Sequence, residues 1–174
     1  MKKLFCLSAA LSIAAVCVLA NPVVTGNDRG VKKKKENPWE PNTAIEFQFS
    51  KDFPKANSVN WTYHEFVEAT FFENGVAKTA YYDENDNLVG TKTDVDLIAL
   101  PEKARDHINK EYPGYSIEKV VFFGDNEAND TDMSLFNQSV EDEDNYFPLL
   151  IKGSKEIILK VSPEGDVSFF GNFK

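Results

Sequence analysis

The sequence predicts an α+β fold in which helices lie on one face of an antiparallel sheet. Two amphipathic segments, beginning near residues 43 and 101, have apolar residues at helical spacing and stop at an aromatic–proline pair. Short extended segments joined by tight turns follow each of them. Helices on one face of such a sheet bury both kinds of apolar surface. Because the pattern occurs twice, we expect two similar units, at about 43–99 and 100–174, that form one sheet.

Residues 1–20 have the three parts of a secretory signal peptide. Lys2 and Lys3 form the positive start, an uncharged run extends from Leu4 to Leu19, and Ala20 supplies a small residue before the expected cleavage position. The run is shorter than the about 20 residues that cross a bilayer. No later segment is long and apolar enough to span one. We therefore expect export to the periplasm or the medium.

Both cysteines of the chain, Cys6 and Cys17, fall inside the predicted signal peptide. Residues 14–16 do not match the pattern that precedes a lipid-modified cysteine, so we expect no lipoprotein. After cleavage no thiol remains, and the fold uses no disulfide although its compartment would permit one.

The chain is acidic, with a formal net charge of −9. Affinity for nucleic acid comes largely from Lys and Arg on phosphates, so this balance disfavours nucleic acid as a partner. The run Lys32–Lys35 is the exception, and we interpret it as a solvated charge run. It lies within residues 21–42, a stretch with several Pro and Gly residues that we interpret as a flexible linker.

The first unit is predicted to begin with a helix at Thr43. Residues 43–46 match a capping box, and Pro54 ends the helix. Its apolar face consists of residues four positions apart: Ile45, Phe49 and Phe53. Extended segments follow at 66–72, 76–82 and 88–93. Asn74-Gly75 joins the first two, because this pair accepts the positive φ of a tight hairpin turn.

The second unit repeats this order. Pro101 suits the first turn of a helix, and Pro113-Gly114 stops it. The apolar face of this helix is expected at Ala104, Ile108 and Tyr112. Extended segments are expected at 117–123, 146–151, 157–161 and 167–170. Residues 125–145 depart from the first unit, and their many acidic residues favour an exposed acidic loop, with disorder as an open alternative.

A spaced pattern of aromatic residues and prolines runs through residues 44–170. It comprises Phe49, Phe53-Pro54-Lys55-Ala56, Val59, Trp61, Ala69, Phe71, Ala80, Tyr82, Leu100-Pro101 and Tyr112-Pro113-Gly114-Tyr115. This pattern resembles the PepSY-like group, small exported proteins of Bacteroidota with a beta-lactamase-inhibitor-like fold. The resemblance implies two similar units that share a sheet. Some relatives of this fold bind and inhibit enzymes through the concave sheet face, and the PepSY name points to regulation of secreted proteases. Fold alone does not carry function across.

The sequence offers no catalytic constellation, so we expect a protein that is not an enzyme and has no cofactor and no metal site. His64 and His107 are the only histidines and fall in different units. The mature chain has no cysteine that could serve as nucleophile or metal ligand. Residues 83–94 partly resemble a calcium loop, but Leu88 stands where that loop needs glycine. A polar turn is the simpler interpretation.

Alternation along the strands predicts a binding surface on the sheet face away from the helices. If Ala69 and Tyr82 point to the helices, their sequence neighbours point the other way. Phe72, Tyr81 and Phe170 then lie on this second face, where aromatic side chains could anchor an interface.

The favoured hypothesis is a binding module that recognises a protein of the cell envelope, as an inhibitor or regulator. Two alternatives stay open. One is a calcium- or cation-responsive envelope protein that uses the acidic residues of 125–145, and the other is a structural envelope component. The sequence leaves the oligomeric state open.

Overall fold

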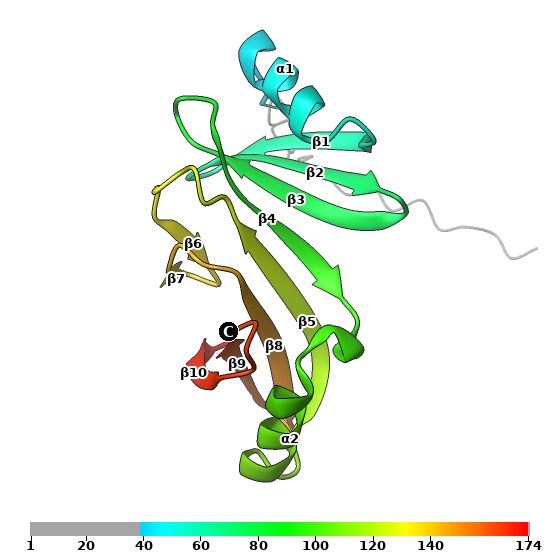
Figure 1. The fold of residues 1–174 in the computed structure, drawn as a ribbon, viewed down its shortest axis with the longest axis vertical. Helices are drawn as coiled ribbons and strands as arrows, with labels where there is room; N and C mark the ends of the chain where they lie inside the picture. The colour runs from blue at the N-terminus through cyan, green and yellow to red at the C-terminus, as the bar shows by residue number, and fades with distance from the viewer. Residues whose placement is uncertain (1–38, 174) are drawn as a thin grey trace, which may run out of the picture. The chain divides into compact units, whose positions relative to one another are not determined.

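The structure is a computed structural model that describes residues 39–173. The predicted signal peptide, most of the predicted linker and the Lys32–Lys35 run lie outside these residues. The elements, in chain order, are α1 (Thr43–Asp52), β1 (Asn57–Tyr63), β2 (Val67–Glu73), β3 (Val76–Tyr82), β4 (Leu88–Val95), the 3-10 helix η1 (Leu97–Ala99), α2 (Glu102–Glu111), β5 (Ser116–Asp125), β6 (Met133–Leu135), β7 (Gln138–Val140), β8 (Asn145–Lys152), β9 (Lys155–Val161) and β10 (Val167–Asn172) (Figure 1). None of the helices in this part of the chain is long and apolar enough to cross a membrane.

Eight strands form one antiparallel sheet in the order β1-β2-β3-β4-β5-β8-β9-β10, and β6 pairs only with β7. A helix followed by four strands of the large sheet occurs twice, first as α1 with β1–β4 and then as α2 with β5 and β8–β10. The pairing of β4 with β5 joins the two units, with Thr93 opposite Phe122. The predicted α+β fold, in which two similar units form one sheet, is therefore confirmed.

Both helices pack on the same face of the sheet. Helix α1 buries Ile45 and Phe49 against strands β2 and β3, where Ala69 and Phe71 are fully covered. Helix α2 buries its own apolar side chains against β5, β8 and β9, on a cluster that includes Leu150. The predicted apolar faces of both helices and the inward side of β2 are thus confirmed.

The N-cap of α1 is Asn42. Its Oδ1 accepts hydrogen bonds from the backbone N–H groups of Ala44 at 2.8 Å and Ile45 at 2.9 Å. The expected capping box starting at Thr43 is therefore wrong by one residue, because an asparagine side chain caps a helix as well as threonine does. At the other end the helix stops before Pro54, as predicted.

Strand β1 is an edge strand that the sequence pattern does not predict. Its first four residues, 57–60, are all exposed, so they show no alternation of buried and exposed positions. A register shift occurs there, and Ser58 has a positive φ of 56°. Trp61, farther along the strand, packs its ring 5.2 Å from that of Phe49. The strand is thus attached to α1 by an aromatic contact rather than by a regular apolar stripe.

Residues 125–145 are not an exposed loop, so that interpretation is wrong. Strands β6 and β7 within this segment form a hairpin, whose turn residues Phe136 and Asn137 both have positive φ. The hairpin buries Met133, Leu135 and Val140 on the sheet face away from the helices. Most acidic residues of the segment lie on its flanks and are exposed, whereas Asp125 is half-buried. Burial of the apolar side chains against the sheet stabilises this arrangement, and most of the flanking charges stay in water.

We call the sheet face away from the helices the open face. The hairpin covers the part of it formed by β5, β8 and β9, and the core beneath it reaches Tyr81 on β3 and Val89 on β4. Phe72 on β2 and Ala77 on β3 stay exposed. Under the hairpin, the open face has a core that includes Val121, Phe123 and Phe147.

Candidate functional site

The structure places the three predicted partner-binding residues at different depths on the open face. Phe72, near the end of β2, is 45% exposed. Tyr81 is only 5% exposed, and its ring lies edge-on to that of Phe66 at 6.5 Å. Phe170 is half-buried, with its ring 4.9 Å from that of Phe147. All three point away from the helices, but Phe72 is the only one of them that is almost half exposed. A partner-binding role for these residues stays a prediction.

A cleft opens on the open face beside the hairpin, with a volume of ≈ 120 Å³. Its floor is apolar and consists of Val121 on β5 with Phe147 and Leu149 on β8. Its wall is aromatic, with Phe136 from the hairpin turn and Phe173 from the residues after β10, whose ring centroids are 6.3 Å apart. We call this feature the open-face cleft.

The β4 side of the cleft carries a charged rim of Lys92, Asp94 and Lys119. Lys119 Nζ lies 2.7 Å from Asp94 Oδ2, and both side chains are about half exposed. Lys92 Nζ lies 5.8 Å from the centroid of the Tyr81 ring. Among residues 39–173, no carboxylate forms an ion pair with Lys92. The rim therefore has one more positive than negative charge, although the chain as a whole is acidic.

Phe72 lies on the same cross-strand row as the cleft floor. Phe72 pairs with Ala77 on β3, and the register between β3 and β4 places Ala77 beside Asp94. Asp94 pairs in turn with Val121, which pairs with Phe147. Since strands lie about 4.8 Å apart, Phe72 and Val121 are separated by roughly 14 Å across the open face. The predicted residue Phe72 and the cleft thus belong to one surface that extends over both units.

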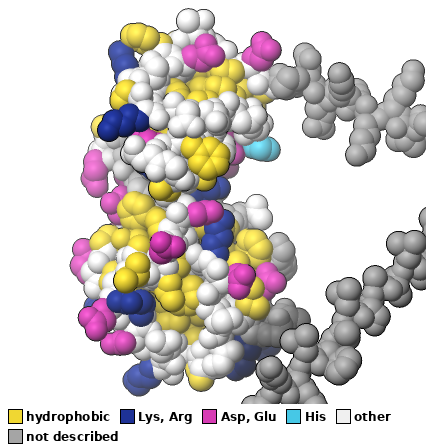
Figure 2. Space-filling view, turned by 90° about the vertical axis from the view of Figure 1, so that its right-hand side faces the viewer, with side chains coloured by type: hydrophobic (Ala, Val, Ile, Leu, Met, Phe, Trp, Pro, Cys, Tyr) yellow, Lys and Arg dark blue, Asp and Glu magenta, His cyan; other side chains and the backbone are white. Residues whose placement is uncertain are grey.

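Exposure by itself does not single out this surface. Phe47 on α1 is 60% exposed and Ile98 in η1 is 78% exposed, both away from the cleft. Figure 2 shows one side of the domain, on which hydrophobic patches are bordered by side chains of both charges. Scattered apolar side chains are common on protein surfaces. The cleft differs because it combines a concave apolar floor with a few polar groups at its edge, as binding sites do.

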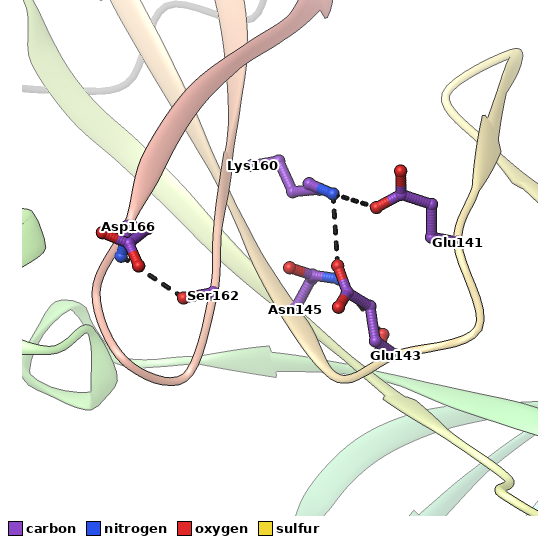
Figure 3. Close-up of polar contacts among 6 residues, drawn as sticks. All are labelled: Glu141, Glu143, Asn145, Lys160, Ser162 and Asp166. Atoms are coloured by element: carbon purple, nitrogen blue, oxygen red, sulfur yellow. Dashed lines mark hydrogen bonds and ion pairs between the residues drawn. The ribbon is translucent and has the colours of Figure 1, made fainter.

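Polar contacts attach the C-terminal flank of the hairpin to the sheet (Figure 3). Lys160 on β9 pairs with Glu141 and, at 3.2 Å, with Glu143. Buried Asn145 donates from Nδ2 to the backbone oxygen of Glu143 at 3.2 Å. Hydrogen bonds from Asn145 and Lys160 lower the pKa of the Glu143 carboxyl. Hydrogen bonding to Glu141 raises the pKa of Lys160. These contacts position the hairpin, and with it Phe136, over β8.

The N-terminal flank of the hairpin is attached to the turn between β3 and β4. Asn126 and Asn129 both donate from Nδ2 to the backbone oxygen of Leu88, at 2.6 and 3.0 Å. Asn129 also donates to Asp83 Oδ2 at 3.2 Å. Hydrogen bonds on both flanks therefore hold the hairpin across the two units.

The partial calcium-loop pattern beginning at Asp83 is a polar turn in the structure. Asp83 Oδ1 accepts hydrogen bonds from the backbone N–H groups of Asn85 at 2.8 Å and Asn87 at 2.9 Å. Within residues 39–173, no three or more His, Cys, Asp or Glu residues are grouped so as to hold a metal ion. Both carboxylate oxygens of Asp83 thus accept hydrogen bonds that shape the turn and its contact with Asn129.

The two histidines lie on different elements. His64 follows β1, with its Nδ1 at 3.2 Å from Glu68 Oε1, whereas His107 is exposed on α2. The fold does not bring them together in a shared site.

Most residues of the open-face cleft were not found from the sequence. Val121 and Leu149 belong to strands that were predicted, but only the sheet order brings them together. Phe136 had a local signal, because it is a lone aromatic residue at a tight turn within an acidic segment. Phe173 had none, since it lies beyond the last strand and reaches the cleft only through tertiary packing.

No protein-family model and no curated protein matches the chain. Solved structures do share its fold. A BLIP-like protein from Bacteroides fragilis is 20% identical, with a TM-score of 0.62 over 78% of this chain and 89% of that chain. A DUF2874 family protein from Bacteroides ovatus is 19% identical, with a TM-score of 0.63 over 77% and 89%. A protein from Bacteroides eggerthii with a provisional periplasmic description is 16% identical, with a TM-score of 0.62 over 77% and 90%.

These similarities confirm the expected resemblance at the level of the fold. At such identities they establish the architecture alone. The chain has the α+β fold of BLIP-like and DUF2874 family proteins of Bacteroides.

Proposed function

We propose that this protein is an exported, non-enzymatic binding module that recognises a protein partner through its open face. The open-face cleft carries this proposal. Small-molecule and cofactor sites usually enclose about 300–1,000 Å³, whereas this cleft has ≈ 120 Å³. It therefore suits one side chain of a larger partner, and partners often anchor an interface by inserting a bulky side chain into such a pocket.

Phe72 extends the proposed interface beyond the cleft. A ring that is almost half exposed, on the same cross-strand row, offers a second apolar contact for the same partner. Ala77, between Phe72 and the rim, is small and exposed and leaves room for a partner chain to cross the face. Tyr81 and Phe170 support this surface from below.

The location that we propose is the periplasm or the cell exterior. It is supported by the signal-peptide pattern in residues 1–20 and by the provisional periplasmic description of one structural relative. A role as inhibitor or regulator of the partner is supported by the resemblance alone, because some relatives of this fold bind and inhibit enzymes through the concave sheet face.

Capture from an envelope extract of the source organism tests the proposal, with the mature chain of residues 21–174 as bait. Wild type should retain one saturable partner. The double variant Phe72→Ala/Phe173→Ala should lose it, because both exposed anchors are gone. Phe47→Ala removes an even more exposed ring from α1 and should retain the partner. Melting temperatures of all three proteins separate lost contact from lost folding.

Two results would redirect the proposal. Full retention of the partner by the double variant, with unchanged melting, would exclude the open face. A melting temperature that rises with millimolar calcium and falls with chelator would favour the calcium-responsive alternative.

A further inference from the structure

We propose that the open-face cleft recognises a partner segment in which one bulky apolar side chain lies next to a carboxylate. This inference rests on the proposed function and specifies the chemistry of the partner. The apolar part would contact Val121, Leu149 and Phe173, and the carboxylate would meet the rim.

The floor of the cleft favours an apolar side chain of the partner over a charged one. Val121 and Phe147 form an almost fully buried floor beside half-buried Leu149, and none of the three carries a polar atom on its side chain. A charged group pushed to this floor would lose its hydration without gaining a partner. An apolar side chain would instead gain contact with the floor and with the aromatic wall of Phe136 and Phe173.

The rim favours a negative charge next to that side chain in the partner segment. Asp94 already pairs with Lys119, so its charge is compensated. Within residues 39–173, Lys92 forms no ion pair and lies over the Tyr81 ring, near the outer limit of about 6 Å for a cation–π contact. The ring orients the ammonium group but leaves its charge available. A carboxylate at this edge would gain Lys92 as a partner, whereas a lysine or arginine would meet a like charge.

The negative charge of the rest of the chain increases the preference of an acidic segment for this rim. The chain carries a net charge of −9, so an acidic segment is repelled by most of the surface. A locally positive rim beside an apolar cleft therefore offers an acidic segment a favourable binding position, with its apolar side chain in the cleft and its carboxylate at the rim. A basic segment would find many acidic sites elsewhere, whereas the one carboxylate of this rim, Asp94, already pairs with Lys119.

The test uses three acetylated, amidated peptides as probes: Gly-Phe-Glu-Gly, Gly-Phe-Gln-Gly and Gly-Phe-Lys-Gly. Each is titrated into the ¹⁵N-labelled mature protein at low salt. Backbone amide shifts should move at Val121, Leu149 and Phe173 in each case, and affinity should fall in the order Glu, Gln, Lys. An exposed ion pair supports a difference of about two- to fivefold between the Glu and Lys peptides. Raising the salt concentration should shrink that difference.

Lys92→Gln should abolish the preference for the Glu peptide, and Lys51→Gln, the same charge change on α1, should preserve it. Equal binding of the Glu and Lys peptides to wild type, shifts that map away from the cleft, or no shifts with any peptide would each overturn the inference. The proposed function has its own criterion, loss of the captured partner in Phe72→Ala/Phe173→Ala. A partner lost in that variant but kept by Lys92→Gln would leave the function standing and reject the charge preference.

Discussion

At the scale of single residues, the hydrogen bond between Tyr82 and Asp52 beneath α1 contributes measurably to the stability of the fold. Tyr82 is fully buried, and its hydroxyl donates to Asp52 Oδ2 at 3.0 Å. Asp52 also accepts from Gln48 Nε2 at 2.9 Å, so it keeps one donor when the hydroxyl is removed. Tyr82→Phe should therefore lower the free energy of unfolding by about 1 kcal/mol, measured by urea denaturation. Tyr63→Phe, at an exposed ring, should change it by less than about 0.5 kcal/mol. Equal effects of the two variants would contradict this expectation.

The buried tyrosines also predict how stability depends on alkaline pH. Burial raises the pKa of both Tyr81 and Tyr82, with nearby Glu68 and Asp52 adding to the respective shifts. The folded protein therefore keeps two protons that the unfolded chain loses near pH 10. Their stabilising effect should be complete below pH 10 and decline as the pH rises further. Absorbance at 295 nm should show two of the six tyrosines ionising only on unfolding. Ionisation of all six with unchanged circular dichroism would refute this.

The charged carboxylate of Asp125 should lower the stability of the folded protein. Burial raises the pKa of its carboxyl, and repulsion from Asp142 adds to the shift. The charged form is disfavoured in the folded state, so this residue costs stability as the pH rises through the titration of its carboxyl. Asp125→Asn should raise the melting temperature at pH 7, and the gain should disappear near pH 3. Asp132→Asn, at an exposed position, serves as the control. A lower melting temperature for Asp125→Asn at pH 7 would show that the carboxylate has a stabilising role.

At the scale of elements, the β6–β7 hairpin determines whether residues 125–145 belong to the core. Leu135 is buried in the same cluster as Val121 and Phe147. Leu135→Ala should therefore cost about 2–4 kcal/mol in urea denaturation, as core truncations do. Ser134→Ala, at the exposed neighbour, should be nearly neutral. A cost below about 0.5 kcal/mol for Leu135→Ala would restore the interpretation as an exposed loop.

Helices and strands with a periodic apolar pattern could be predicted from the sequence, whereas the short hairpin strands could not. Strands β2, β3, β4, β5, β8, β9 and β10 and both long helices were predicted within a few residues, because each carries a periodic apolar pattern or a strong turn signal. Strands β6 and β7 have only three residues each, so the alternation of Met133 and Leu135 was too short to stand out against the acidic flanks. Edge strand β1 begins with four exposed residues and lacked alternation for a different reason.

The candidate site was predicted less completely than the fold. Alternation along β2 placed Phe72 on the open face, because side-chain direction in a strand is a local property. The cleft is a product of sheet order, since β8 reaches β5 only after the hairpin and Phe173 arrives from the chain end. Strand order and the position of a chain end depend on contacts between distant residues, which one sequence does not reveal.

At the scale of the whole domain, the two units are joined by more than the pairing of β4 with β5. The core beneath the hairpin combines Phe66, Tyr81 and Val89 of the first unit with Val121 and Phe147 of the second. The open-face cleft likewise takes its rim from both units and its floor from the second. Partner binding at this cleft should therefore depend on the two units folding together.

This dependence predicts a single unfolding transition, which the two tryptophans can detect selectively. Trp39 and Trp61 both lie in or before the first unit, so their fluorescence reports on that unit, whereas far-ultraviolet circular dichroism reports on both. Leu150 is fully buried beside α2 in the second unit. Leu150→Ala should cost about 2–5 kcal/mol and lower the urea midpoint equally by both probes, because a shared core makes the loss common to both units. A fluorescence midpoint that stays at the wild-type value while the dichroism transition splits in two would show that the units unfold separately. The open-face cleft, whose floor belongs to the second unit, would then be lost before the first unit unfolds.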